Sequence, residues 1–152
     1  MALHIGDPAP DFDLEDERGN RVRLADFRGR SAVVLMFYPA DETPGCTRQL
    51  CAARDDYDRY LAAGVAVFGV NPASAERHRK FVERHGLKTP LLIDDGARVA
   101  RAYDALYPIP LVTLVNRTVV GIDRDGTIRF YERGIPSTDR ILAAVAPAAA
   151  AT

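Results

Sequence analysis

The sequence has no tryptophan, only two cysteines and no long uninterrupted apolar run. Two cysteines are too few for a disulfide framework, which excludes a small fold held together by disulfides. No segment reaches the roughly 18 apolar residues of a membrane-spanning helix. The formal net charge is only -1, which argues against nucleic acid or a membrane as partner. The N-terminal segment also lacks the pattern of a signal peptide, so we expect a cytoplasmic protein.

The length and composition are those of one ordinary globular domain. The chain has 152 residues, of which 47% are hydrophobic and 27% are charged. A chain of this size can bury one sizeable core. We therefore expect a single domain over residues 1–146, followed by a frayed, alanine-rich tail over residues 147–152.

Apolar strands alternate with helical segments along the chain. The apolar run at 32–38 is typical of a strand buried on both faces. Residues 12–14 and 21–24 flank a Gly-Asn turn and predict a hairpin. Further strands are expected at 65–70, 91–93, 119–122 and 128–131, and helices at 43–64, 74–86, 97–103 and 138–145. This order predicts an α/β fold of three layers, with a central mixed β-sheet flanked by helices and an N-terminal β-hairpin.

Cys46 falls in the first turn of the helix that is expected after the central strand. Thr43 is suited to cap that helix, and Pro44 suits its first position. Free backbone N–H groups and the helix dipole at this place favour an anion, and therefore the thiolate form of Cys46. The position also lies beyond the carboxyl end of a strand, where ligands tend to bind in open α/β sheets. The pattern indicates a reactive cysteine.

Cys51 lies five residues after Cys46 in the same expected helix. An ideal helix would set the two about 140° apart around its axis, with Cα atoms roughly 8 to 9 Å apart. A disulfide needs a Cα separation of about 4.4 to 6.8 Å. Any bond between the two cysteines therefore requires the first helical turns to unwind. This geometry disfavours a static structural disulfide, and zinc would usually need four ligands; two inert buried thiols remain as an alternative.

The stretch FYPADETPGCT at residues 37–47 closely resembles the active-site segment of the peroxiredoxins. The spacing to Cys51 is similar to that in the branch of the bacterioferritin comigratory protein and peroxiredoxin Q, where the resolving cysteine lies in the same helix. The resemblance covers nearly the whole chain apart from the alanine tail. It implies a thioredoxin-like fold and a hydroperoxide reductase that needs no metal, haem, flavin or other cofactor.

The resemblance implies a role for each of five residues. Cys46 would be the peroxidatic cysteine and Cys51 the resolving cysteine. Pro39 would shield the nucleophile from water, Thr43 would hydrogen-bond the peroxide, and Arg117 would hold the thiolate and polarise the O–O bond. A permanently cationic side chain with several donors suits the last role. Plainer interpretations remain for three of these residues. Pro39 could simply end the strand, Thr43 could simply cap the helix, and Arg117 could be a surface charge at the end of a strand.

The implied cycle begins when the Cys46 thiolate attacks the hydroperoxide and becomes a sulfenic acid. The helix start then unwinds, Cys51 forms an internal disulfide, and thioredoxin or a similar dithiol restores both thiols. One alternative is a thiol-disulfide oxidoreductase, although those usually separate their cysteines by two residues. Another is a non-catalytic, redox-sensing thioredoxin-fold module. We expect a monomer, with a dimer as the alternative.

Several positions depart from the family pattern or need their own interpretation. Gln49 stands where the family usually carries a glutamate that orders the active-site arginine. Residues 106–115 are unusually apolar; core packing is the favoured interpretation, and a substrate approach or a contact surface is the alternative. His78 and His85 share an apolar helix face, and His4 is isolated. We expect all three histidines to be structural, because no pair has the carboxylate company of a metal site.

Overall fold

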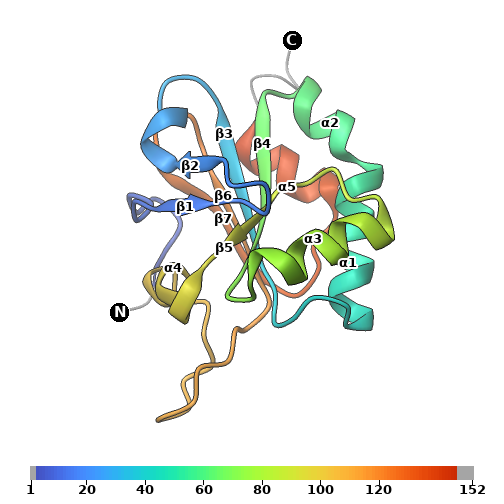
Figure 1. Ribbon diagram of the computed structural model, residues 1–152. Helices are drawn as coiled ribbons and strands as arrows, with labels where there is room; N and C mark the ends of the chain where they lie inside the picture. Colours follow the sequence, from blue (N-terminus) through green and yellow to red (C-terminus); the bar gives the residue numbers. More distant parts are fainter. Residues whose placement is uncertain (1–2, 147–152) are drawn as a thin grey trace.

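The computed structural model describes residues 3–146 (Figure 1), so the tail expected at 147–152 lies outside the described residues. The strands are β1 (Asp13–Glu15), β2 (Arg21–Arg23), β3 (Ala32–Phe37), β4 (Val65–Asn71), β5 (Leu91–Ile93), β6 (Thr118–Ile122) and β7 (Ile128–Arg133). The helices are α1 (Pro44–Asp55), α2 (Tyr57–Ala62), α3 (Ala75–His85), α4 (Arg98–Ala102) and α5 (Thr138–Val145), and short 3-10 turns η1 (Leu24–Phe27) and η2 (Asp95–Ala97) complete the fold. Within this part of the chain, no helix has both the length and the hydropathy to cross a membrane.

The main sheet is mixed and has five strands in the order β5-β4-β3-β6-β7. Strands β3, β4 and β5 run parallel to one another, whereas β6 pairs antiparallel with β3 and β7 antiparallel with β6. Strands β1 and β2 form a separate antiparallel hairpin. The expected mixed sheet and N-terminal hairpin are therefore confirmed.

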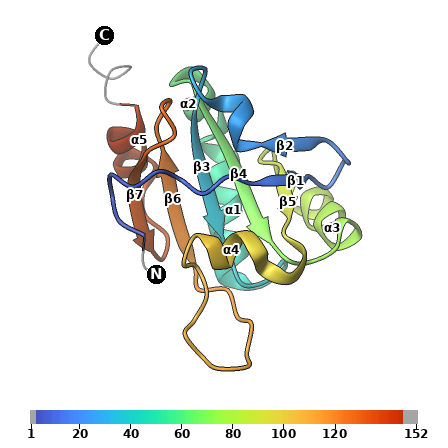
Figure 2. The same ribbon diagram turned by 90° about the vertical axis from the view of Figure 1, so that its left-hand side faces the viewer.

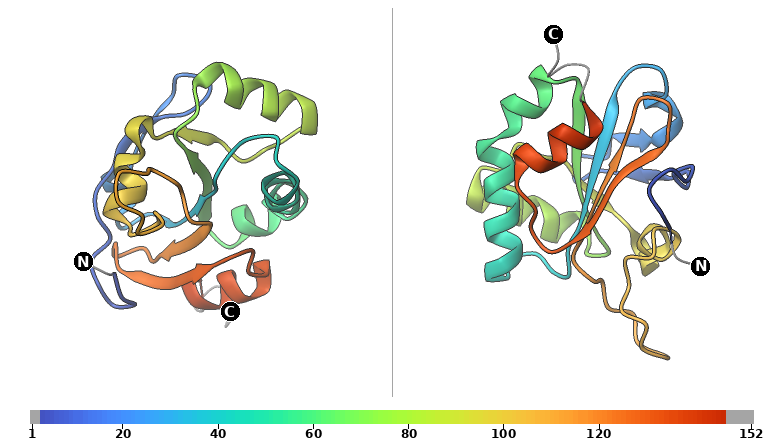
Figure 3. Two further views of the ribbon diagram at one scale, coloured as in Figure 1. Left: turned by 90° about the horizontal axis from the view of Figure 1, so that it is seen from below. Right: turned by 180° about the vertical axis from the view of Figure 1, so that it is seen from behind.

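The side chains of β3 divide the core between the two faces of the sheet. All six residues of this strand are buried, as its apolar run predicted. Val33, Leu35 and Phe37 join the cluster on the face of α4 and the hairpin, whereas Val34 and Met36 join the cluster that includes residues of α2 and α5. Figure 3 shows the sheet lying between these groups of elements, with α1 on the side of α2 and α5. The fold therefore has the three layers expected.

The helix expected over residues 43–64 is interrupted at Asp56. This residue takes φ -98° and ψ 8°, and α2 begins directly after it. Its carboxylate accepts a hydrogen bond of 2.6 Å from the hydroxyl of Thr138 at the start of α5. A tertiary contact thus accompanies the break, and no local sequence pattern announced it. Gly64, with φ 73°, closes α2 in the left-handed conformation that glycine tolerates.

The expectation that residues 106–115 pack in the core holds only at the two ends of the segment, where Val115 is buried and Leu106 packs against the core; for the residues between them it is wrong. An isolated bridge between Leu106 and Val115 closes the segment, which projects from the body of the molecule as a loop (Figures 1 and 2). We call residues 106–115 the apolar loop. Its five exposed large side chains are Tyr107, Ile109, Leu111, Val112 and Leu114. These side chains are between 42% and 107% exposed, so hydrophobic composition alone did not predict burial here.

Candidate active site

The sheet register places Arg117 at the carboxyl end of the central strand. Strand β6 runs antiparallel to β3, with Thr118 opposite Phe37. Arg117 directly precedes β6 and therefore lies where β3 ends and the chain turns toward α1. Cys46 is the third residue of α1. Two residues far apart in the sequence thus meet at one edge of the sheet, because one strand ends where the other begins.

The guanidinium group of Arg117 contacts the sulfur of Cys46. Its Nη2 atom donates to Cys46 Sγ over 3.2 Å, and its Nη1 atom donates to Gln49 Oε1 over 2.8 Å. Cys46 is fully buried and Gln49 is 2% exposed. A cation at this distance favours a negatively charged sulfur. Gln49 therefore keeps the acceptor that orients the arginine, although it supplies no charge and its Nε2 atom has no partner among the described residues.

Gly45 is a further residue of this site that the sequence did not single out. A Cβ atom at this position would lie 3.0 Å from Arg117 Nη2. Glycine therefore leaves room for the guanidinium group to pass close to the helix backbone and reach the sulfur. The position of Gly45 directly before Cys46 was the only sequence feature that pointed to a role in the site. The fold shows that the side chain passing over it is that of Arg117.

Thr43 and Pro39 lie in the connection between β3 and α1. Thr43 takes the N-cap position of α1, yet its hydroxyl makes no capping bond and donates instead to the carbonyl oxygen of Ala40 over 2.9 Å. The interpretation of this side chain as a helix cap is therefore wrong. Pro39 is half-buried and borders a hollow of about 270 Å³ that Asn71 and Arg77 also line. Among the described residues, no hydrogen bond joins Thr43 to Cys46.

Cys51 lies five residues, about one and a half turns, further along α1, and both cysteines are free thiols. Cys51 is partly exposed and packs beside the apolar cluster that contains Cys46 and Leu50. Both cysteines thus lie within one regular helix, as expected from the sequence. In this state the helical geometry keeps the two sulfur atoms from bonding.

A closed ring of buried hydrogen bonds lies beneath the same loop. The Tyr38 hydroxyl donates to Asp41 Oδ1 over 2.5 Å, and His78 Nδ1 lies 2.6 Å from Asp41 Oδ2. His78 Nε2 lies 3.3 Å from the Asn71 carbonyl oxygen, and Asn71 Nδ2 donates to the Tyr38 carbonyl oxygen over 2.8 Å. All four residues are at most 3% exposed. Burial and the Asp41 carboxylate raise the pKa of Tyr38, so its hydroxyl stays protonated as a donor.

The ring corrects the view that the histidines lack carboxylate neighbours. His78 pairs with Asp41, and His85 Nε2 lies 3.4 Å from Glu42 Oε1 at the surface. A polar residue on an apolar helix face was the signal for His78, but the sequence could not identify its partner. The sequence also left Asp41 unassigned, although it stands between Pro39 and Cys46.

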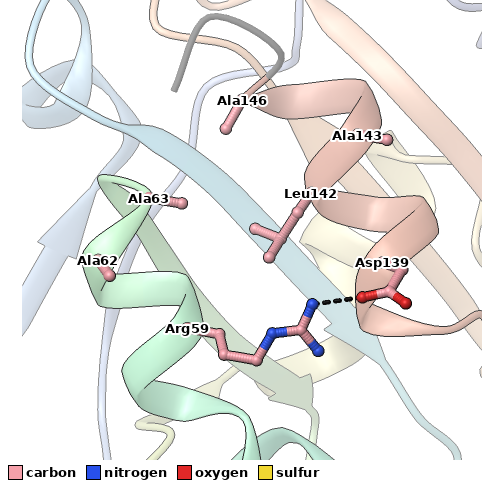
Figure 4. A pocket seen from close by; sticks show the side chains of 7 residues that line it. All are labelled: Arg59, Ala62, Ala63, Asp139, Leu142, Ala143 and Ala146. Carbon is pink, nitrogen blue, oxygen red and sulfur yellow. Dashed lines mark hydrogen bonds and ion pairs between the residues drawn. The ribbon is translucent and has the colours of Figure 1, made fainter. Parts of the chain in front are cut away.

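A separate hollow of about 500 Å³ lies between α2 and α5 (Figure 4). Arg59 of α2 forms an ion pair with Asp139 of α5 across it, and Leu142 and four alanines complete its lining. None of the five residues expected to carry the chemistry lines this hollow. It is therefore distinct from the Cys46 site.

Comparisons with known proteins place the chain in a family. Residues 5–131 match the model of the AhpC/TSA family. The crystal structure of peroxidoxin BcpB from Mycobacterium tuberculosis superimposes with a TM-score of 0.84 at 30% identity, covering 93% of this chain and 96% of that chain. The chain belongs to the AhpC/TSA family, the peroxiredoxins. The thioredoxin-like fold and the family resemblance expected from the sequence are confirmed.

Two curated peroxiredoxins show the same relationship at the level of sequence. Peroxiredoxin Bcp of Bacillus subtilis is 42% identical over 104 residues, which make up 68% of this chain and 66% of the relative. Chloroplastic peroxiredoxin Q of Oryza sativa subsp. japonica is 40% identical over 126 residues, which make up 82% of this chain and 57% of the relative. The chain therefore spans somewhat less than two thirds of the length of these curated relatives.

Proposed function

We propose that this peroxiredoxin is a thiol peroxidase that reduces hydrogen peroxide and organic hydroperoxides with Cys46 as its nucleophile. The observation that carries the proposal is the contact between the Arg117 guanidinium group and the buried Cys46 sulfur at 3.2 Å. A fixed cation beside a buried thiol stabilises the thiolate before the reaction. It also stabilises negative charge that develops on the departing oxygen. Family membership supports the same activity.

In the first step, the Cys46 thiolate attacks the terminal oxygen of the hydroperoxide. An S–O bond forms while the O–O bond breaks, and the departing oxygen takes up a proton to leave as water or an alcohol. The sulfur is oxidised to a sulfenic acid and the peroxide is reduced. Thr43 is assigned to the peroxide because its hydroxyl is oriented by Ala40 and retains acceptor capacity. Pro39 is assigned to limiting the access of water.

In the second step, the Cys51 thiol attacks the sulfenic sulfur of Cys46. An S–S bond forms and water leaves, which requires the first turns of α1 to unwind because both cysteines lie in this helix. An external dithiol such as thioredoxin then reduces the disulfide by exchange. We further propose that the protein acts as a monomer. We also propose a cytoplasmic location, because the cycle needs a compartment that keeps thiols reduced.

Intact mass spectrometry of the reduced protein tests this function directly. One equivalent of hydrogen peroxide should remove two hydrogen atoms from the wild type through the disulfide, whereas Cys51→Ser should gain one oxygen as a trappable sulfenic acid. Cys46→Ser is the matched control and should remain unchanged. Unaltered thiols in the wild type, or peroxide turnover by Cys46→Ser, would exclude the mechanism. Reduction of protein disulfides without peroxide turnover would indicate an oxidoreductase instead.

A further inference from the structure

The connection from β3 to α1 contains a buried carboxylate, that of Asp41, which forms hydrogen bonds with Tyr38 and His78. Asp41 Oδ1 accepts from the Tyr38 hydroxyl at the end of β3, and Asp41 Oδ2 faces His78 Nδ1 of α3. The side chain of His78 is fully buried and that of Asp41 is 1% exposed. Removing either partner would leave a buried polar or charged group without its hydrogen bond. The pair therefore ties the loop firmly to α3.

Both ring nitrogens of His78 face oxygen atoms. Nδ1 faces the Asp41 carboxylate at 2.6 Å and Nε2 faces the Asn71 carbonyl group at 3.3 Å. Only the doubly protonated imidazolium can donate at both nitrogens. The hydrogen bond to the Asp41 carboxylate needs only the proton on Nδ1, so it forms with either the neutral or the charged ring. Asn71 in turn donates to the Tyr38 carbonyl group, so the ring returns to the strand from which the loop leaves.

The next residue of the loop is also tied to α3, but at the surface. Glu42 has φ 68°, a left-handed conformation that is unusual for glutamate. Its carboxylate lies 2.6 Å from Arg84 Nη1 and 3.4 Å from His85 Nε2, at the end of α3. Two consecutive loop residues are therefore held by one helix. The exposed tie contributes less than the buried one, because solvent screens surface ion pairs.

The first turn of α1, which follows Asp41 and Glu42, is stabilised by other contacts. Thr47 N donates to the Thr43 carbonyl oxygen over 2.8 Å, and Arg117 contacts Cys46. The Arg117 contact is to the sulfur that the reaction itself changes. Unwinding can therefore start after Glu42 without breaking any bond of Asp41.

We propose that the Asp41–His78 pair is a positioning unit that anchors the upstream end of the segment that unwinds during the cycle. This inference rests on the proposed function. By holding the loop in the shape that continues into α1, the pair favours the helical state in which Cys46 contacts Arg117. It thereby slows the attack of Cys51 on the sulfenic acid.

The anchor then sets how the sulfenic acid is divided between two reactions. Attack by the Cys51 thiol gives the disulfide and water. Attack by the Cys46 sulfenate on a second hydroperoxide gives a sulfinic acid and releases water or an alcohol. A tighter anchor lengthens the life of the sulfenic acid and favours the second reaction. A looser anchor favours the disulfide but holds Cys46 less well for the first attack.

Amide hydrogen exchange on the reduced protein tests the anchor without any peroxide. In His78→Leu, the amides of residues 47–50 should exchange about tenfold faster or more, because a buried charged hydrogen bond is lost. In His78→Asn, the amide nitrogen replaces Nδ1 as donor to Asp41 and should restore much of the protection. Ile141→Ala removes buried side-chain volume from α5, away from the ring, and controls for a general loss of stability. Its exchange at residues 47–50 should not rise selectively.

Single-turnover kinetics with hydrogen peroxide provide the second readout. In His78→Leu, the oxidation of Cys46 should slow, disulfide formation should accelerate, and the yield of sulfinic acid under excess peroxide should fall. Unchanged exchange in His78→Leu, an equal local rise in Ile141→Ala, or an unchanged ratio of disulfide to sulfinic acid would overturn the anchor. If wild-type Cys46 does not react with peroxide, the peroxidase proposal fails, and hydrogen exchange still decides whether the pair anchors the helix start.

Discussion

Two loops at the Cys46 end of the molecule reverse the usual relation between polarity and burial. The connection between β3 and α1 carries Tyr38 and Asp41, which are at most 3% exposed, whereas the apolar loop exposes Leu111 completely. Asp41 is buried because two donors satisfy its carboxylate. The apolar loop is exposed because it projects beyond every layer that could cover it (Figure 2). Available partners, rather than polarity alone, decided which side chains this fold buries.

Of the substitutions in these two loops, Asp41→Leu should have the largest effect on stability. This change leaves the Tyr38 hydroxyl and the His78 imidazole buried without their common acceptor. The free energy of unfolding should fall by about 3 to 5 kcal/mol, as expected when one partner of a buried charged pair is removed. Urea denaturation measures the loss. Glu42→Leu, at the neighbouring surface tie, should cost about 1 kcal/mol or less; equal losses in both variants would contradict the difference between the two ties.

Arg117→Lys should slow the reaction of Cys46 with peroxide while leaving the stability of the fold nearly unchanged. Lysine keeps the charge but cannot contact Cys46 and Gln49 with one planar group, so the peroxide step should slow about 10- to 100-fold. The free energy of unfolding should change by about 1 kcal/mol or less. Competition for hydrogen peroxide measures the rate. Arg133→Lys, where the arginine contacts Thr118 instead, is the control and should react at the wild-type rate; a similar slowing there would argue against a specific role of Arg117.

Thr89→Val tests whether a buried polar group without a hydrogen-bond partner lowers stability. Thr89 is 1% exposed, and its hydroxyl has no hydrogen-bond partner among the described residues. Replacing the hydroxyl with a methyl group should raise the free energy of unfolding by about 1 kcal/mol. Thr118→Val is the opposite case, because its hydroxyl donates to the Asn116 carbonyl oxygen over 2.7 Å. Thermal unfolding measures both variants. Thr118→Val should lose stability, and a gain there would refute the distinction.

Leu111→Ser should have the smallest effect. The side chain packs against nothing in the described chain, so the free energy of unfolding should change by about 0.5 kcal/mol or less. The matched comparison is Leu50→Ala, in a fully buried position of α1, which should cost about 2 to 5 kcal/mol. Chemical denaturation distinguishes the two. A loss above 1 kcal/mol for Leu111→Ser would mean that the apolar loop contributes to the fold.

Much of the fold followed from local patterns. The β-branched and aromatic run at residues 32–38 predicted a fully buried strand, and β3 occupies the centre of the sheet. The helix expected over residues 74–86 has the expected ends, because Ser74 accepts from the backbone as N-cap of α3 and Gly86 takes φ 59° at its C-cap. The break at Asp56 was not predictable, because it coincides with a contact to Thr138 from a distant element.

The sequence by itself determined that Cys46 lies in the first turn of the helix that follows a buried strand and that Cys51 follows in the same helix. Strand periodicity, Pro44 and the spacing of two residues are local properties that survive without knowledge of the fold. Only the tertiary structure decided that Arg117, 71 positions away, donates to Cys46, and that His78 closes a ring on Asp41. Such contacts depend on strand register and on the packing of α3 against the sheet. Hydrophobic periodicity specifies which face of an element is buried, but it does not specify the partner that the face will meet.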